Sequence, residues 1–239
     1  MDLTDRVAVV TGASSGLGTH FARALIDRGA TVYGLARSTD TLEAVRNDLG
    51  AAFRPLSCDL REEAQVEDAF ATVRDRADRI DVLINNAGLG QFGPVDELPL
   101  ADWDVQMDTN LRGVFLCTRE VVPVMRKQNE ASGFGGHILN VASIAGLLGN
   151  PNLTAYNASK FGLRGFSESL MKEVRDDGIR VTCFYPGSTD TNFFDVAGVE
   201  MTDNPLEPED VAATAVHVLE SPANHLISEV VMRPLRPRG

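Results

Sequence analysis

Residues 6–18, which read RVAVVTGASSGLG, decide how this chain folds. The first half is a continuous apolar, β-branched run, which is typical of a strand buried on both faces of a parallel sheet. Beyond the glycine-rich turn, apolar residues recur at helical spacing from Phe21 to Ile26, and Gly29 ends the predicted helix. A strand, such a turn and a helix N-terminus together form a phosphate cradle, because free backbone N–H groups and the positive helix end face the anion.

Three glycines fit separate parts of this cradle. We expect Gly12 to permit the tight turn, Gly16 a close approach of the backbone to the ligand, and Gly18 close packing of the helix. A glycine triplet alone is a weak signal, and an ordinary structural turn is the alternative. The preceding strand and following helix supply the context that a dinucleotide site requires.

A second apolar run, Thr31–Arg37, predicts a strand that ends about 20 residues after the glycines, where such folds bind the adenosine ribose. An NAD site usually has an acidic residue there, to accept a hydrogen bond from the 2′-hydroxyl. Here Ala36 leaves room, and Arg37 supplies a permanently charged, planar guanidinium that suits a 2′-phosphate. We therefore predict NADP(H) as the cofactor; an arginine solvated in a loop, in an NAD enzyme, is the alternative.

Strand and helix patterns keep alternating through the rest of the chain, without an internal repeat or a linker. This alternation predicts an α/β fold in a single domain, residues 1–239, with a doubly wound parallel sheet of about seven strands. In such a fold the ligand binds at the carboxyl ends of the strands. The further predicted strands are 51–59, 81–84, 136–143, 179–185 and 226–232, and the further predicted helices are 62–76, 102–128, 154–176 and 207–219.

Composition limits the class of protein. A chain of 239 residues with 44% hydrophobic content is long and apolar enough to bury a core. The net charge of −12 argues against nucleic acid or an anionic membrane as partner, since both are bound by clustered cations. Residues 1–6 lack the basic and apolar layout of a signal peptide, so we expect a cytoplasmic protein.

The cysteines and histidines do not form a ligand pattern. Cys58, Cys117 and Cys183 are widely spaced within apolar segments, which predicts buried free thiols rather than disulfides. The four histidines are equally scattered. We expect no structural metal.

Tyr156 and Lys160 are the first candidate catalytic pair. On a helix, residues four apart project from one face, which places an ammonium beside a phenol. A fixed cation stabilises the phenolate and lowers the tyrosine pKa toward neutral pH, where the phenol can exchange a proton with a carbonyl oxygen. Taken alone, the pattern is more often a lysine that snorkels from an ordinary helix.

Ser143 and Asn110 become candidates through their positions. Ser143 ends a predicted strand beside the expected cleft, where a hydroxyl can donate to developing negative charge. A helix-capping serine is the alternative for Ser143, and a packed polar group within a long helix is the alternative for Asn110.

These motifs together resemble the short-chain dehydrogenase/reductase family, in its single-domain, NADP-preferring branch, over essentially the whole chain. The resemblance implies a Rossmann-type fold with Tyr156 as proton donor or acceptor and Lys160 also binding the nicotinamide ribose. It further implies that Ser143 bonds the substrate carbonyl and that Asn110 anchors a water relay. The motifs that carry it are Thr11–Gly18, Asn85–Gly88, Asn110, Ser143, Tyr156 with Lys160, and Pro186–Gly187.

The resemblance also implies an extended cofactor site. Thr189 stands where the family commonly has an aliphatic residue, which leaves a backbone contact there and puts a side-chain contact in doubt. The implied cofactor-binding residues are Gly12, Ser14, Ser15, Gly16, Leu17, Gly18, Arg37, Asp59, Leu60, Asn86, Ala87, Gly88, Tyr156, Lys160, Pro186, Gly187, Thr189 and Thr191.

The expected activity is NADP(H)-dependent interconversion of a ketone or aldehyde and its alcohol. Residues 192–201 form a short, apolar segment that is expected to cover the pocket, which favours a small or medium carbonyl compound. Surface packing of Phe193 and Phe194, without substrate contact, is the alternative. Small and apolar residues along the helix that carries Tyr156 indicate either burial or a subunit interface, so a homodimer or homotetramer is expected. A non-catalytic NADP-binding sensor or scaffold on the same fold is the competing function.

Overall fold

One parallel sheet of seven strands, in the order β3-β2-β1-β4-β5-β6-β7, organises the chain. The computed structural model describes residues 1–193, 203–222 and 224–236. The strands are β1 (Val7–Thr11), β2 (Thr31–Ala36), β3 (Phe53–Ser57), β4 (Val82–Asn85), β5 (Gly136–Val141), β6 (Ile179–Pro186) and β7 (Glu229–Met232). The doubly wound α/β fold expected from the sequence is therefore confirmed, with the Rossmann-type order of strands.

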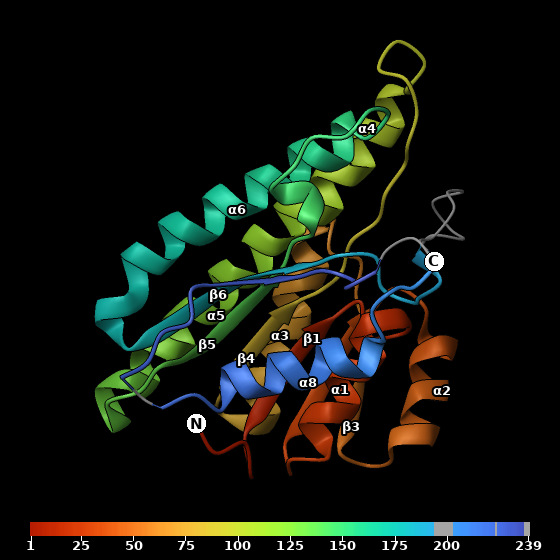
Figure 1. Cartoon of the computed structure of the whole chain (residues 1–239). Coiled ribbons are helices and arrows are strands. Elements are labelled where there is room, and N and C mark those ends of the chain that lie inside the picture. Colours follow the sequence, from red (N-terminus) through yellow and green to blue (C-terminus); the bar gives the residue numbers. More distant parts are fainter. Residues whose placement is uncertain (194–202, 223, 237–239) are drawn as a thin grey trace.

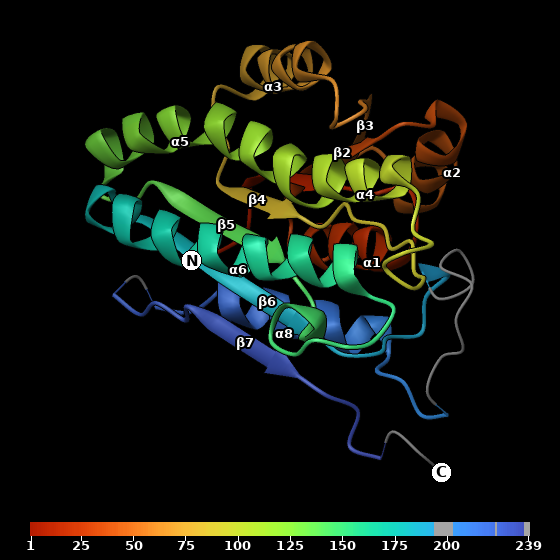
Figure 2. The ribbon, with the colours of Figure 1, turned by 90° about the horizontal axis from the view of Figure 1, so that it is seen from above.

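Helices cover both faces of the sheet, so the fold has three layers (Figure 1). On one face lie α1, α2 and α8, and on the other lie α3, α5 and α6, which Figure 2 shows in succession across the sheet. The helices are α1 (Gly16–Ile26), α2 (Thr39–Leu49), α3 (Glu63–Ala77), α4 (Leu100–Met107), α5 (Gly113–Ser132), α6 (Thr154–Val174) and α8 (Pro208–Leu219).

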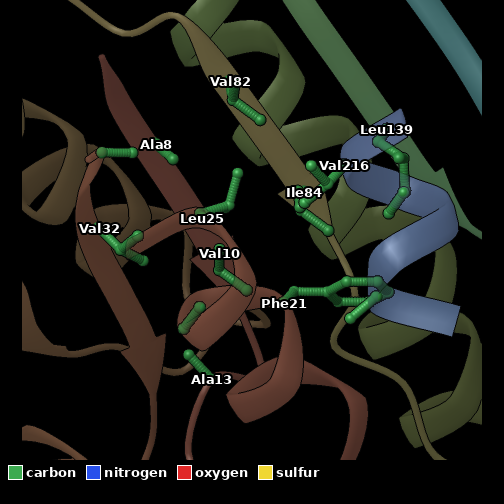
Figure 3. Close-up of a cluster of buried hydrophobic side chains, with 14 of the residues drawn as sticks. Ala8, Val10, Ala13, Phe21, Leu25, Val32, Val82, Ile84, Leu139 and Val216 are labelled. Atoms are coloured by element: carbon green, nitrogen blue, oxygen red, sulfur yellow. The ribbon is translucent and has the colours of Figure 1, made fainter. Parts of the chain in front are cut away.

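Each face of the sheet has its own hydrophobic core. Figure 3 shows the first, where Phe21 and Leu25 of α1 and Val216 of α8 lie against Val10 of β1 and Ile84 of β4. Alternate residues of the same strands point to the opposite core, under α3, α5 and α6. Because both faces are buried, the central strands need apolar residues at every position, which explains the unbroken run in β1.

Two helices differ from the sequence-based expectation. The sequence pattern left residues 39–49 without an element, whereas the structure has α2 there; only Leu42 and Val45 of this helix are buried, so its apolar stripe is narrow. Its start does carry a signal, since the Ser38 side chain accepts a hydrogen bond from the Thr41 N–H as an N-cap.

The helix expected over residues 102–128 is longer and is interrupted. It runs as α4, a π-helical turn at Asp108–Arg112, and α5. A π-helical turn inserts an extra residue into the helix, and such turns are frequent at functional sites. Here the turn contains Asn110, whose side chain is completely buried.

The buried thiols predicted from the sequence are confirmed for Cys58, Cys117 and Cys183. Among the described residues, no helix combines the length and apolar character that crossing a bilayer requires.

The outer surface of α5 and α6 leaves Phe115 and Phe161 exposed. A homo-oligomer formed through α6 stays a prediction, which sedimentation of the purified protein tests.

We predict that Gly18→Ala destabilises the protein. A Cβ at Gly18 would lie 2.1 Å from the carbonyl oxygen of Gly12, which is backbone and cannot move without shifting the β1–α1 turn. The expected loss is about 1–3 kcal/mol of unfolding free energy, measured by urea denaturation. Gly93→Ala is the control, because nothing lies within 4 Å of a Cβ there. Equal stability of the two variants would contradict the close packing of α1 on β1.

Candidate active site

A cavity of about 1250 Å³ lies along the carboxyl edge of the sheet. It is lined at one limit by Arg37 and Thr41, beyond β2, and at the other by Arg233 and Pro234, beyond β7. Pockets for single drug-sized ligands have volumes of about 300–1,000 Å³, so this larger cavity suits a dinucleotide together with a second molecule. The cavity therefore follows the edge where parallel folds bind their ligands.

The turn between β1 and α1 is shaped for close approach. Gly12 has φ of +65°, and a Cβ there would lie 2.9 Å from the Cα of Ala87. Thr11 joins the two strand ends on which this turn rests: its hydroxyl accepts hydrogen bonds from the N–H groups of Asn86 and Ala87, both at 3.0 Å. Gly12, Ser14 and Ser15 line the cavity immediately before the N-terminus of α1, which fits a cofactor phosphate.

Three expected catalytic side chains meet on one wall of the cavity. Ser143 follows β5, while Tyr156 and Lys160 project from the first turns of α6. Ser143 and Tyr156 line the cavity together, and the Ser143 hydroxyl lowers the pKa of the Tyr156 phenol. The Lys160 Nζ donates to the Val141 carbonyl oxygen at 3.0 Å and lies 5.7 Å from the centre of the Tyr156 ring.

Burial controls the acid–base properties of this group. It raises the pKa of the Tyr156 phenol to about 12, and the influence of the Ser143 hydroxyl opposes that rise only in part. Burial also lowers the pKa of the Lys160 ammonium to about 8. The expectation that Lys160 lowers the tyrosine pKa is therefore not met in this structure, because loss of solvation dominates at both groups. Tyr156 is consequently protonated at neutral pH, as a proton donor must be.

The residues between Tyr156 and Lys160 attach α6 to the rest of the site. Asn157 donates to the carbonyl oxygens of Ala145 at 2.6 Å and Leu148 at 2.7 Å, in the segment that follows Ser143. The Ser159 hydroxyl donates to the Tyr156 carbonyl oxygen and accepts from the Asn110 side chain at 3.0 Å. The first turns of α6 are thus hydrogen-bonded both to the segment that follows Ser143 and to Asn110.

Asn110 lies behind the cavity rather than on it. Its side chain accepts from the Leu89 N–H and donates to the Leu89 carbonyl oxygen, both at 2.9 Å. Together with its bond to Ser159, these contacts join the π-helical turn, the segment after β4 and α6. This arrangement resembles the packed polar group that the sequence left as the alternative.

Cationic and polar groups gather at the end of the cavity beside β2. Arg37 is exposed and lines the cavity together with Ser38 and Thr41, at the N-terminus of α2. Asp59 also lines it, and hydrogen bonds from Arg61 lower the pKa of its carboxyl. A permanent cation beside a helix N-terminus fits a phosphate group.

The segment after β6 is fixed by β7. The Gly187 N–H donates to the Met232 carbonyl oxygen at 2.9 Å. The Thr189 hydroxyl donates to the Gly187 carbonyl oxygen at 3.0 Å, so this side chain bonds within its own loop. The segment expected to cover the pocket falls mostly on residues 194–202, which lie outside the described residues.

The structure brings nearly all of the expected site residues to one cavity. Gly18 and Asn110 are the exceptions and lie in the layer behind its wall. Sequence reasoning did not single out part of the lining, because those residues belong to no motif and meet only in the folded chain. Among them are Ser38, Phe92, Ile144 and Asn150.

Comparison with known proteins agrees with this geometry. A family model described as short chain dehydrogenase matches residues 6–200. The chain belongs to the short-chain dehydrogenase family. It is 33% identical over 253 residues to Dehydrogenase/reductase SDR family member 11 of Gallus gallus, covering 97% of this chain and 96% of that protein.

Solved structures of this dehydrogenase family share the whole fold. The chain is similar to 3-ketoacyl-(acyl-carrier-protein) reductase from Brucella melitensis complexed with NADH, with a TM-score of 0.91, 29% identity, and coverage of 98% of this chain and 99% of that one. It is also similar to a metagenomic short-chain oxidoreductase in complex with NADP, with a TM-score of 0.85, 34% identity and coverage of 98% and 99%. A nicotinamide cofactor is thus supported by both comparisons.

We predict that Lys160→Met is more stable than the parent at pH 7. The pKa of the Lys160 ammonium falls from 10.5 to about 8 on folding. At about 1.4 kcal/mol per unit, the buried charge costs roughly 3–4 kcal/mol at neutral pH. The unfolded chain binds this proton more tightly, so the stability of the parent rises as the pH increases from about 8 to 10.5, and the gap closes.

Urea denaturation across this pH range measures the effect. Lys172→Met, at an exposed lysine on the same helix, is the matched control. A stability gap for Lys160→Met that stays constant between pH 7 and pH 10 would contradict the cost of burying the ammonium.

Proposed function

We propose that this dehydrogenase interconverts a small or medium ketone or aldehyde and the corresponding alcohol, with NADP(H) as the preferred cofactor. The observation that carries the proposal is the placement of Ser143, Tyr156 and Lys160 on one wall of a cavity that begins at the glycine-rich turn. The similarity to the short-chain dehydrogenase family and to its solved structures supports an oxidoreductase that uses a nicotinamide cofactor.

The cofactor supplies or accepts the hydride when it is bound. During reduction the Tyr156 phenol gives its proton to the carbonyl oxygen, and the Ser143 hydroxyl donates a hydrogen bond to the same oxygen. Burial suits this direction, because it keeps the phenol protonated at neutral pH. Lys160 binds the cofactor ribose and orients the tyrosine, and Asn110 holds the backbone beside α6 in place.

Three features at the end of the cavity beside β2 support NADP(H) over NAD(H). Arg37 provides a charged fork for the 2′-phosphate, and Ala36 leaves out the carboxylate that would repel it. The N-terminus of α2, capped by Ser38, adds its dipole at the same place. Ser14 and Ser15 line the cavity nearby and can share the phosphate.

Tyr156→Phe should abolish nearly all turnover while leaving NADPH affinity close to that of the parent. The change removes the proton donor but keeps the ring and its packing. Initial rates with a carbonyl panel and NADPH titration by fluorescence measure the two quantities. Retained turnover would contradict the role of this tyrosine. Lys160→Ala is the informative companion, because loss of both turnover and affinity is expected if Lys160 also binds the ribose.

Arg37→Ala should lower kcat/KM for NADPH by roughly ten- to a hundredfold and leave NADH almost unaffected, since a charge-assisted contact is worth about 1.5–3 kcal/mol. Ala36→Asp should shift the preference further, by repelling the phosphate and offering the NAD 2′-hydroxyl an acceptor. Arg54→Ala, at an exposed arginine on β3 that does not line the cavity, is the control. A parent that prefers NADH would show that Arg37 is a solvated loop residue.

A non-catalytic NADP-binding sensor is the competing function, since a fold does not determine an activity. The complete set of Ser143, Tyr156 and Lys160 on the cavity wall argues for catalysis. NADPH binding without turnover of any carbonyl in the panel would favour the sensor.

A further inference from the structure

Two phenylalanines from distant parts of the chain pack against the Tyr156 ring. Phe92, after β4, lies 5.5 Å from it between ring centres, with the planes at 72°. Phe193, after β6, lies 5.7 Å away with the planes at 46°. The two phenylalanine rings are 6.4 Å apart. All three rings line the cavity, so they form one aromatic surface beside the phenolic hydroxyl.

Gly90 makes room for this aromatic surface. A Cβ at Gly90 would lie 2.6 Å from the Phe92 ring and 3.1 Å from the tip of the Phe193 ring. Both rings therefore occupy positions that a larger residue at 90 would disturb. Because ring tips on flexible side chains can move, a methyl group at this position would displace the phenylalanines without breaking the backbone.

Apolar side chains line the same cavity as the three rings. They include Leu89, Ile144 and Leu153, while Ser143 and Tyr156 bring a pair of hydroxyls to the cavity wall. When a substrate's carbonyl oxygen binds to these two hydroxyls, the group attached to its carbonyl carbon contacts aromatic and aliphatic side chains. Asn150, Ser188 and Arg233 also line the cavity and allow polar substituents elsewhere on the substrate.

We propose that Phe92, Phe193 and the Tyr156 ring select carbonyl compounds that carry an aromatic ring directly on the carbonyl carbon, namely aryl ketones and aryl aldehydes. This inference rests on the proposed reductase function and adds its substrate class. Aromatic rings attract one another through their quadrupoles in edge-to-face and offset arrangements, in addition to the burial of apolar area. A saturated ring of similar size gains the burial but not this directional attraction.

The test compares acetophenone with cyclohexyl methyl ketone. The two have the same ring size and the same reacting group, and their intrinsic reactivities cancel when the ratio of kcat/KM values is compared between variants. We expect this aryl-to-cyclohexyl ratio to fall about two- to tenfold in Phe92→Leu and in Phe193→Leu, through the KM for acetophenone. Gly90→Ala should lower it as well, because the added methyl displaces the rings.

Two variants are controls for the aromatic surface. Phe92→Tyr keeps a ring at that position and should keep the ratio. Phe161→Leu removes an exposed ring from the same helix as Tyr156, away from the cavity, and should leave the ratio unchanged. Thermal denaturation and NADPH affinity of each variant show whether a loss arises from misfolding.

Binding measurements separate the inference from the proposed function. Calorimetric titration of both ketones into protein saturated with NADP⁺ should show tighter binding of acetophenone, and the variants should lose this preference in step with the ratio. A ratio that Phe92→Leu and Phe193→Leu leave unchanged would overturn the inference while the reductase function stands. Absence of turnover with the binding preference intact would overturn the reductase function and keep the aryl-binding surface. Absence of the binding preference in the parent overturns the inference in either case.

Discussion

The hydrogen bonds between Thr11 and the N–H groups of Asn86 and Ala87 are the constraint on which the site depends. They join the carboxyl ends of β1 and β4, the two central strands from which the sheet extends in opposite directions. At such a reversal the connections leave toward opposite faces, which opens a crevice. The glycine-rich turn lies on one side of this junction, and the segment holding Leu89 and Phe92 lies on the other. Both walls of the cavity are therefore positioned by one buried hydroxyl.

A second set of hydrogen bonds connects these strand ends to the cavity wall that carries Ser143, Tyr156 and Lys160. Asn85 donates to Asn140 at 2.8 Å, and Asn140 donates to Ser167 at 2.9 Å, so that β4, β5 and α6 are joined by buried amides and a hydroxyl. Asn110 and Ser159 repeat the connection nearer the tyrosine. Unpaired buried polar groups are costly, so each satisfied bond restricts how α6 can lie on the sheet. This packing determines the positions of Tyr156 and Lys160, because both project from α6.

The same burial that orders the site works against the charges within it. Removing water raises the pKa of Tyr156 and lowers that of Lys160, so each group is held closer to its neutral form. Burying the Lys160 ammonium near the Tyr156 phenol therefore lowers the free energy of unfolding. Such costs are common at active sites, because burial shifts the pKa values of groups that would have their ordinary values in water. The aromatic rings around Tyr156 contribute to this dryness.

Several features could be predicted from the sequence alone: the strand–turn–helix at residues 6–26, the alternation of strands and helices that makes the sheet parallel, and most of the residues that reach its carboxyl edge. These follow from local physics: period, β-branching and the backbone freedom of Gly12 are properties of neighbouring residues. Helix α2, with its narrow apolar stripe, and the π-helical turn at Asn110 could not be predicted from the sequence, because both depend on the elements that pack against them. The raised pKa of Tyr156 and the lowered pKa of Lys160 depend on the tertiary structure, since solvation depends on every surrounding element. The tertiary structure alone placed Phe92 and Phe193 against Tyr156, because residues about 100 positions apart meet only when the strands that precede them share one edge of a sheet.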